Sequence, residues 1–173
     1  MSKVSLYIYT KNTDLHAMSA FETIKSVLNY PYLNGLKRYR HITLTFTGWT
    51  DDEARQKVDE FNRHSFQLLN PNKEAALLQL QDALVGEISS SDLDAEGRLL
   101  KRLIETAFDG HLTEVSVSIA WEFSVDAHGL SEDLLKDELR HRIIDTTSYT
   151  QGLLINPIYE HFKWQISTRT AVG

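Results

Sequence analysis

The hydrophobic pattern at the start of the chain predicts a strand, a helix and a second strand. Residues Val4 to Ile8 alternate apolar side chains with serine or tyrosine, a period of two that is typical of a β-strand. Apolar residues then recur every three or four positions over 17–28, as on one face of an α-helix, and Asp14 precedes them as a candidate N-cap. Asn29 to Gly35 is expected to end this helix, and alternation over 41–47 predicts the next strand.

A second helix has clear start and stop signals. Thr50 and Glu53 are spaced as a capping box, in which each side chain accepts a hydrogen bond from the backbone amide of the other residue. The apolar face of the helix runs over 54–68. Leu69-Asn70-Pro71 is expected to end the helix, because proline disfavours helical geometry in the residue before it. Ala75 to Gln81 then predicts a third strand.

The second half of the chain repeats this order of elements. The pattern predicts a strand over 83–88, a helix with its apolar face over 99–107, a strand over 115–123, a helix capped by Ser131 and running to 143, and a strand over 162–166. We interpret the chain as an internal duplication, with one repeat over 1–82 and the other over 83–173. No linker rich in glycine or proline separates the repeats, so we expect them to pack closely.

Composition narrows the class of protein. The 173 residues carry a formal net charge of −6, 42% hydrophobic residues and no cysteine. This composition is typical of a globular protein, and the lack of cysteine excludes disulfides, thiol nucleophiles and cysteine-ligated zinc. The net acidity argues against general binding of nucleic acid. No apolar run is long enough to span a membrane, and the chain opens on the first strand without a signal segment, so we expect a cytoplasmic protein.

The sequence contains no recognisable motif for catalysis or cofactor binding. It has no glycine-rich phosphate loop and no nucleophile elbow, and its seven histidines include no His-x-His or His-Glu-x-x-His pair. We therefore expect no catalytic residue, no cofactor and no metal, and interpret the histidines as surface or strand-edge residues. The opposing hypothesis is a small enzyme whose histidines come together only in the fold.

Two basic clusters are candidate contacts for an anion or an acidic partner. Lys37, Arg38 and Arg40 lead into the second predicted strand, whereas Arg140 and Arg142 lie on the fourth predicted helix. The alternative interpretation is a solvated loop for the first cluster and a solvated helix face for the second. The residues alone leave both interpretations open.

Two short motifs resemble those of PurS, the small subunit of phosphoribosylformylglycinamidine synthase. The PurS family has an Asp-Pro-x-Gly stretch before its first helix and a Leu-Leu-x-Asn-Pro-x-x-Glu stretch that ends its second helix. The matching positions are Asp94 and Gly97 for the first motif, Asn156, Pro157 and Glu160 for the second, and Asn70, Pro71 and Glu74 for the second motif in the first repeat. One PurS chain corresponds to one repeat, so the resemblance covers this chain twice.

The resemblance implies a fold, a role and partners. The implied fold is α+β and related to ferredoxin-like sandwiches, with helices on one face of antiparallel sheets and with strand and helix exchange between the repeats. The implied role is a non-catalytic subunit in purine biosynthesis. It would bridge a glutaminase of PurQ type and an ATP-dependent synthetase of PurL type, so that ammonia passes between them. A homodimer of the tandem chain is a further assembly that the resemblance allows.

The chain departs from PurS in one strand motif. A stretch of Val-Arg-Val-Gly-Lys type reads Val115-Ser116-Val117-Ser118-Ile119 in the second repeat, so the arginine, glycine and lysine are replaced. The first repeat has Tyr39 to Ile42 at this place, without Gly-Lys. The alternative hypothesis is therefore a divergent protein of PurS-like fold that has left the complex and serves as a regulatory module binding a small molecule or a protein.

Overall fold

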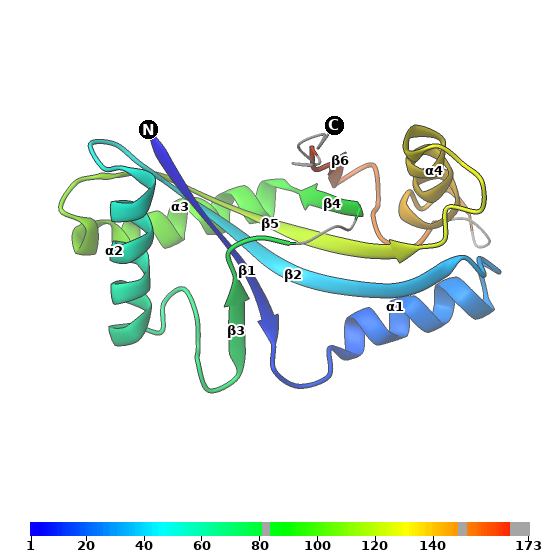
Figure 1. The fold of residues 1–173 in the computed structure, drawn as a ribbon, viewed down its shortest axis with the longest axis horizontal. Coiled ribbons are helices and arrows are strands. Elements are labelled where there is room, and N and C mark those ends of the chain that lie inside the picture. Colours follow the sequence, from blue (N-terminus) through cyan, green and yellow to red (C-terminus); the bar gives the residue numbers. More distant parts are fainter. Residues whose placement is uncertain (81–83, 149–151, 167–173) are drawn as a thin grey trace. The chain divides into compact units, whose positions relative to one another are not determined.

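The computed structural model describes residues 1–80, 84–148 and 152–166. Within them the chain forms an α+β fold of four α-helices and a six-stranded antiparallel sheet, which is compatible with a ferredoxin-like architecture (Figure 1). The elements are β1 (Ser2–Thr10), α1 (Leu15–Ser26), β2 (Leu33–Phe46), α2 (Asp51–His64), β3 (Glu74–Leu77), β4 (Leu84–Ser89), α3 (Ser91–Ile104), the 3₁₀ segment η1 (Glu105–Phe108), β5 (Leu112–Val125), α4 (Glu132–Leu139), the π-helical segment η2 (Arg140–Ile144) and β6 (His161–Trp164).

The strand order of the sheet reads the same from both ends. The order is β3-β1-β2-β5-β4-β6, so the first, second and third strands of each sequence half occupy corresponding places. The two central strands, β2 and β5, each have 14 residues. The register of β1 against β2 pairs Val4 with Leu44 and Leu6 with Ile42. Because opposed residues of antiparallel strands share a face, these four side chains lie on one side of the sheet.

The chain forms two compact units, and each unit takes segments from both sequence halves. The first unit comprises Met1–Asn12, Tyr39–Leu80 and Ser89–Ala120. The second comprises Thr13–Arg38 and the described parts of Gln81–Ile88 and Trp121–Gly173. Thus α1 belongs to a different unit from β1, and α3 to a different unit from β4. The expected repeat boundary near residue 82 falls outside the described residues and stays a prediction.

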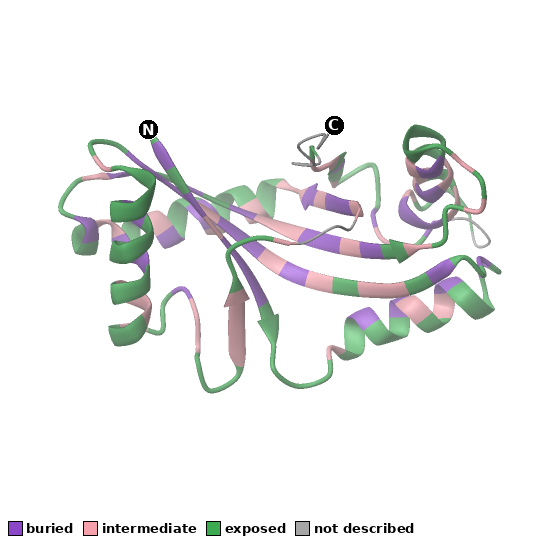
Figure 2. Ribbon diagram, in the orientation of Figure 1, coloured by how far each residue is buried: buried purple, intermediate pink, exposed green. Residues whose placement is uncertain are grey.

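The core of the first unit lies on one face of its strands. Two helices contribute to it, α2 through Ala54 and Val58 and α3 through Leu100 and Ile104. The strand residues of this cluster are Val4, Leu6, Ile8, Ile42, Leu44, Phe46, Leu112, Val115 and Val117. In α2 the two core residues are the only buried ones, and the rest of the helix is largely exposed (Figure 2). This pattern explains why the helix could be predicted from a narrow apolar stripe.

The second unit is built around α1, α4 and the outer strands. Ala17, Ala20 and Ile24 are the buried residues of α1, and Leu135 and Leu139 are those of α4. In β4, Gly86 makes room for an aromatic ring of the edge strand β6. A Cβ atom at Gly86 would lie 2.1 Å from the Phe162 ring, so no larger residue fits without displacing that ring.

The start of β2 corrects one sequence prediction. The strand begins at Leu33, eight positions before the predicted start at His41. Asn34-Gly35 was expected to form a turn, but Gly35 is extended and its Cα faces Ser124 at ordinary contact distance. Consequently Lys37, Arg38 and Arg40 lie within a strand, and the solvated-loop interpretation of this cluster is wrong.

The helix ends correct two further predictions. The second helix ends at His64, so Leu68 is buried from the following loop and Asn70-Pro71 does not end the helix. In the second half, α4 passes into η2 at Arg140, and Asn156-Pro157 follows only after a further loop. The predicted β-strand over 75–81 is shorter and spans Glu74–Leu77, while the last strand ends at Trp164. The three predicted caps, Asp14, Thr50 with Glu53, and Ser131, are confirmed.

Candidate functional site

The first Asn-Pro-x-x-Glu stretch forms a hydrogen-bonded loop before β3. The Glu74 carboxylate accepts a hydrogen bond from the Asn70 amide at 2.9 Å, and the Glu74 amide donates to the Asn70 carbonyl at 2.8 Å. The Asn70 side-chain oxygen accepts from the Asn72 amide at 3.1 Å, which is the geometry of an Asx-turn. Lys11 of the following loop after β1 holds the tip by donating to the Pro71 carbonyl at 2.6 Å.

The second Asn-Pro-x-x-Glu stretch makes the same bonds at the same positions before β6. The Glu160 carboxylate accepts from the Asn156 amide at 3.0 Å, and the Glu160 amide donates to the Asn156 carbonyl at 3.0 Å. The Asn156 side-chain oxygen accepts from the Ile158 amide at 3.1 Å. The asparagine therefore builds the turn and the glutamate closes it in both loops. Sequence spacing identified these residues, although it placed them at helix ends.

The tips of the two loops differ in chemistry. The first loop presents Asn72 and Lys73, both exposed and polar. The second presents Ile158 and Tyr159, which are 79% and 73% exposed. Large apolar side chains so exposed, on a loop held by its own hydrogen bonds, are typical of contact sites for other proteins. The two loops are thus alike in backbone and unlike in what they offer a partner.

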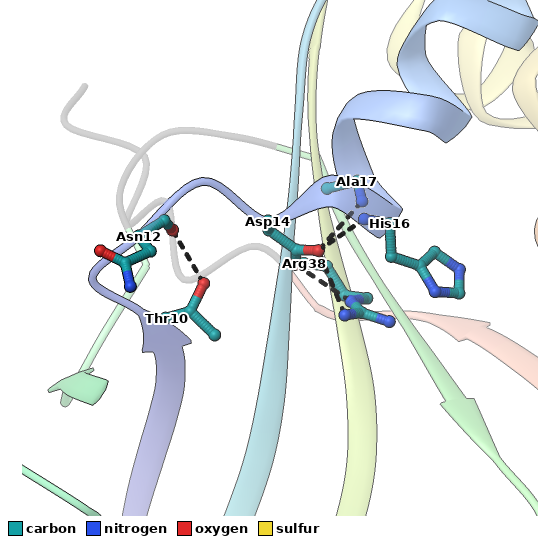
Figure 3. Close-up of polar contacts among 6 residues, drawn as sticks. All are labelled: Thr10, Asn12, Asp14, His16, Ala17 and Arg38. Atoms are coloured by element: carbon teal, nitrogen blue, oxygen red, sulfur yellow. Dashed lines mark hydrogen bonds and ion pairs between the residues drawn. The ribbon is translucent and has the colours of Figure 1, made fainter. Parts of the chain in front are cut away.

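Each basic residue of β2 faces a carboxylate. Asp14 caps α1 by accepting from the amides of His16 and Ala17, and its other side receives Arg38 Nε at 3.1 Å (Figure 3). Arg40 forms an ion pair with Glu96 of α3. Lys37 is more exposed and its Nζ lies 4.0 Å from Glu122 of β5. These three cations are therefore matched by internal anions rather than gathered at one anion-binding site.

Glu122 is the one carboxyl of this group whose environment opposes its charge. Its side chain is only 17% exposed, and burial raises the pKa of Glu122 above its ordinary value, while the nearby Lys37 ammonium partly offsets this effect. The carboxylate thus pays a desolvation cost that a single long ion pair does not fully repay.

The second basic cluster also makes internal contacts. Arg140 Nε lies 3.1 Å from the Asp145 carboxylate, and its guanidinium lies over the Phe162 ring of β6 at 5.2 Å. Arg142 lies over the Tyr30 ring at 5.4 Å. Both residues belong to η2 rather than to a regular helix, so the interpretation as a solvated helix face is wrong. They hold η2 against neighbouring segments of the second unit.

Asp94 and Gly97 occupy different environments on α3. Asp94 is exposed in the first turn, where a carboxylate interacts favourably with the helix dipole. Gly97 is buried against β5. A Cβ atom there would lie 2.7 Å from the Val115 carbonyl oxygen, which is shorter than such contacts allow. Glycine at this position therefore permits close packing of α3 on β5.

The histidines contact aromatic rings in four separate places. The pairs are His16 with Trp121, His41 with Tyr7, His111 with Trp49 and His128 with Tyr32. The His41 ring is stacked on Tyr7 with centroids 4.2 Å apart, and lies near the hydroxyls of Thr43 and Ser118 at 3.3 and 3.4 Å. His41 is buried, against the expectation of a surface residue. Its position within an alternating strand was the available signal.

A polar triad in the second unit was not predicted from the sequence. Glu138 of α4 accepts from the Tyr30 hydroxyl at 2.8 Å, and the same carboxylate oxygen lies 3.1 Å from His128 Nε2. Burial and the Glu138 carboxylate raise the pKa of Tyr30 above its ordinary value, so the phenol keeps its proton and acts as a donor. The triad ties α4 to two loops. Because 108 residues separate Tyr30 from Glu138, no local pattern announces it.

Searches for other sites and for relatives add little. Among residues 1–80, 84–148 and 152–166, no group of three or more histidine or carboxylate side chains is arranged to hold a metal ion. No helix in that part of the chain is long and apolar enough to cross a membrane. Comparison with protein-family models, with curated proteins and with solved structures found no match to this chain.

Proposed function

We propose that this chain is a tandem duplication of a PurS-like unit and acts as a non-catalytic bridging subunit of a purine-biosynthetic amidotransferase. The observation that carries the proposal is the pair of Asn-Pro-x-x-Glu loops. Asn70 with Glu74 and Asn156 with Glu160 make the same three kinds of hydrogen bond at the same spacing, each loop preceding the last strand of its half.

The arrangement of elements supports a duplication. Each half reads strand, helix, strand, helix, strand, and the strand order of the sheet is symmetric about its centre. Each compact unit draws on both halves, as would follow if two repeats exchanged elements like the subunits of a joined dimer. Such an exchange makes neither repeat complete without the other, which favours a single chain as the functional unit.

The difference between the loop tips supports a bridging role. A bridge between two unlike proteins needs two unlike surfaces, and a duplicated chain supplies them once its copies diverge. Here one loop offers Asn72 and Lys73 and the other offers Ile158 and Tyr159. In the proposed complex the apolar tip binds one of the two enzyme subunits, the glutaminase or the synthetase, and the polar tip contributes to binding the other.

Co-purification tests this role. The tagged chain is produced together with the PurQ-type glutaminase and PurL-type synthetase of the same organism, and both are expected in the eluate. Ile158→Asp places a charge on the apolar tip and is expected to weaken retention of one subunit by about tenfold. Leu99→Asp is the matched control, because Leu99 is 56% exposed on α3, outside both loops. Retention of neither subunit by the unmodified chain would contradict the proposal.

A second candidate function is a regulatory module that has left the complex. It is favoured by the replaced strand motif, in which Ser118 lies beside the stacked His41 and Tyr7 rings instead of carrying the family's glycine or lysine chemistry. A thermal-shift screen with metabolites distinguishes the two. A ligand present at 100 times its Kd would stabilise the chain by about 2.7 kcal/mol. A clear shift without binding of either enzyme subunit would favour this candidate.

A further inference from the structure

The strand β3 forms one edge of the sheet. It pairs with β1 on its inner side, in an antiparallel register that places Tyr7 opposite Leu77 and Tyr9 opposite Ala75. Just beyond the strand, the Lys11 amide donates to the Lys73 carbonyl at 2.8 Å, so the residues at 11 and 73 form a hydrogen-bonded pair. Because such pairs alternate along an antiparallel ladder, Ala75 and Leu77 also direct their backbone groups toward β1.

It follows that Ala76 and Leu78 direct their backbone groups outward. An amide and a carbonyl at each of these positions face away from β1 and are available for a further strand. The neighbouring side chains are apolar and exposed, with Leu77 at 40% and Leu78 at 58%. The edge therefore combines outward-directed backbone groups with accessible leucines.

This edge lacks the features that usually prevent strand pairing. The run from Ala75 to Leu80 reads Ala-Ala-Leu-Leu-Gln-Leu, with no charge and no proline. The opposite edge strand, β6, carries exposed His161 and Lys163, and a lysine on an edge strand discourages pairing with another chain. Only one of the two edges is protected in this way.

We propose that β3 pairs antiparallel with β3 of a second copy of this chain, about a two-fold axis at Leu77. This register places Leu77 opposite its counterpart and Ala76 opposite Leu78 of the second copy, so the outward backbone groups of both strands bond to each other. Opposed residues that do not share backbone hydrogen bonds lie about 4.5 Å apart at Cα, which brings the two Leu77 side chains into contact.

A second copy fits this edge better than a foreign strand of charged character. The run carries no charge, so like residues face one another without repulsion, and an acidic or basic strand would find no opposite charge here. Pairing of like edges about a two-fold axis also closes the assembly at two chains. The inference concerns self-association and does not depend on the proposed bridging role.

Disulfide trapping tests the register, since the natural chain has no cysteine. Leu77→Cys would place two thiols across the two-fold axis at a Cα separation within the range of about 4.4–6.8 Å that disulfides require. Mild oxidation is expected to give a covalent dimer at least about tenfold faster than for Leu99→Cys, the matched exposed control. Equal rates for the two variants would overturn the proposed pairing.

Sedimentation equilibrium tests the surface without any cross-link. The unmodified chain is expected to show twice the 19.8 kDa mass of one chain. Leu78→Lys adds a charge to the outer edge and is expected to weaken association by about tenfold or more, whereas Leu99→Lys leaves it unchanged. Circular dichroism melts check that both variants fold. A single-chain mass for the unmodified protein, or a dimer indifferent to Leu78→Lys, would overturn the proposal.

Discussion

Replacing Gly97 by alanine is predicted to destabilise the protein, although alanine is the better helix former. Gly97 lies within α3 and is buried against β5, where an added Cβ would come within 2.7 Å of the Val115 carbonyl oxygen. The obstacle is backbone rather than a flexible side chain, so α3 must move away from β5. That movement also loosens the packing of Leu100 and Ile104, which are buried on the same helix.

The magnitude follows from two opposing effects. Alanine in place of glycine inside a helix is favourable by about 1 kcal/mol. Overpacking a well-filled contact costs about 1–3 kcal/mol, and a clash with a strand backbone lies at the upper end of that range because neither partner can turn aside. The net loss in the free energy of unfolding is therefore about 1–2 kcal/mol. For a chain of this size, each 1 kcal/mol lowers Tm by about 2–4 °C.

Urea unfolding followed by circular dichroism measures this loss. The control is Ala95→Gly, at an exposed position of the same helix, where only helix propensity acts and a loss of about 1 kcal/mol is expected. The two substitutions are reverse exchanges of the same residues, yet both should destabilise. If Gly97→Ala instead stabilised the protein by about the propensity difference, the close approach of α3 to β5 would be refuted.

Three further predictions address a cap, a buried carboxyl and the paired loops. Thr50→Ala should lower the free energy of unfolding by about 1 kcal/mol in urea melts, because the N-cap of α2 is lost. Glu122→Gln should raise Tm near neutral pH, since burial raises the folded-state pKa of Glu122 and its charged form costs stability. That advantage should shrink as the pH falls through the raised folded-state pKa toward the unfolded value, and an unchanged difference would contradict it. Glu74→Ala and Glu160→Ala should each cost about 1 kcal/mol, and unequal losses would argue against equivalent loops.

Local patterns in the sequence predicted the elements whose signals are themselves local. The capping box of Thr50 and Glu53 involves residues three positions apart, and its bonds depend on little outside the first turn of α2. The alternation over 115–123 likewise marks β5, because each residue's face is set by its parity along the strand. These signals survive because tertiary contacts add to them without opposing them.

The start of β2 was mispredicted because the turn signal and the sheet compete. Asn34-Gly35 favours a turn in a short peptide, yet pairing within the sheet keeps Gly35 extended beside Ser124. The Tyr30–Glu138–His128 triad was missed for another reason. Its members belong to segments far apart in the chain, and neither periodicity nor spacing reports which loops a fold will bring together.

The proposed bridging role is tested most directly by the rate of the glutamine-dependent reaction. The purified glutaminase and synthetase subunits are assayed with formylglycinamide ribonucleotide, ATP and glutamine, in the presence and absence of this chain. We predict that glutamine-dependent turnover requires the chain, whereas turnover with free ammonia does not. Full glutamine-dependent turnover by the two subunits alone would contradict the account.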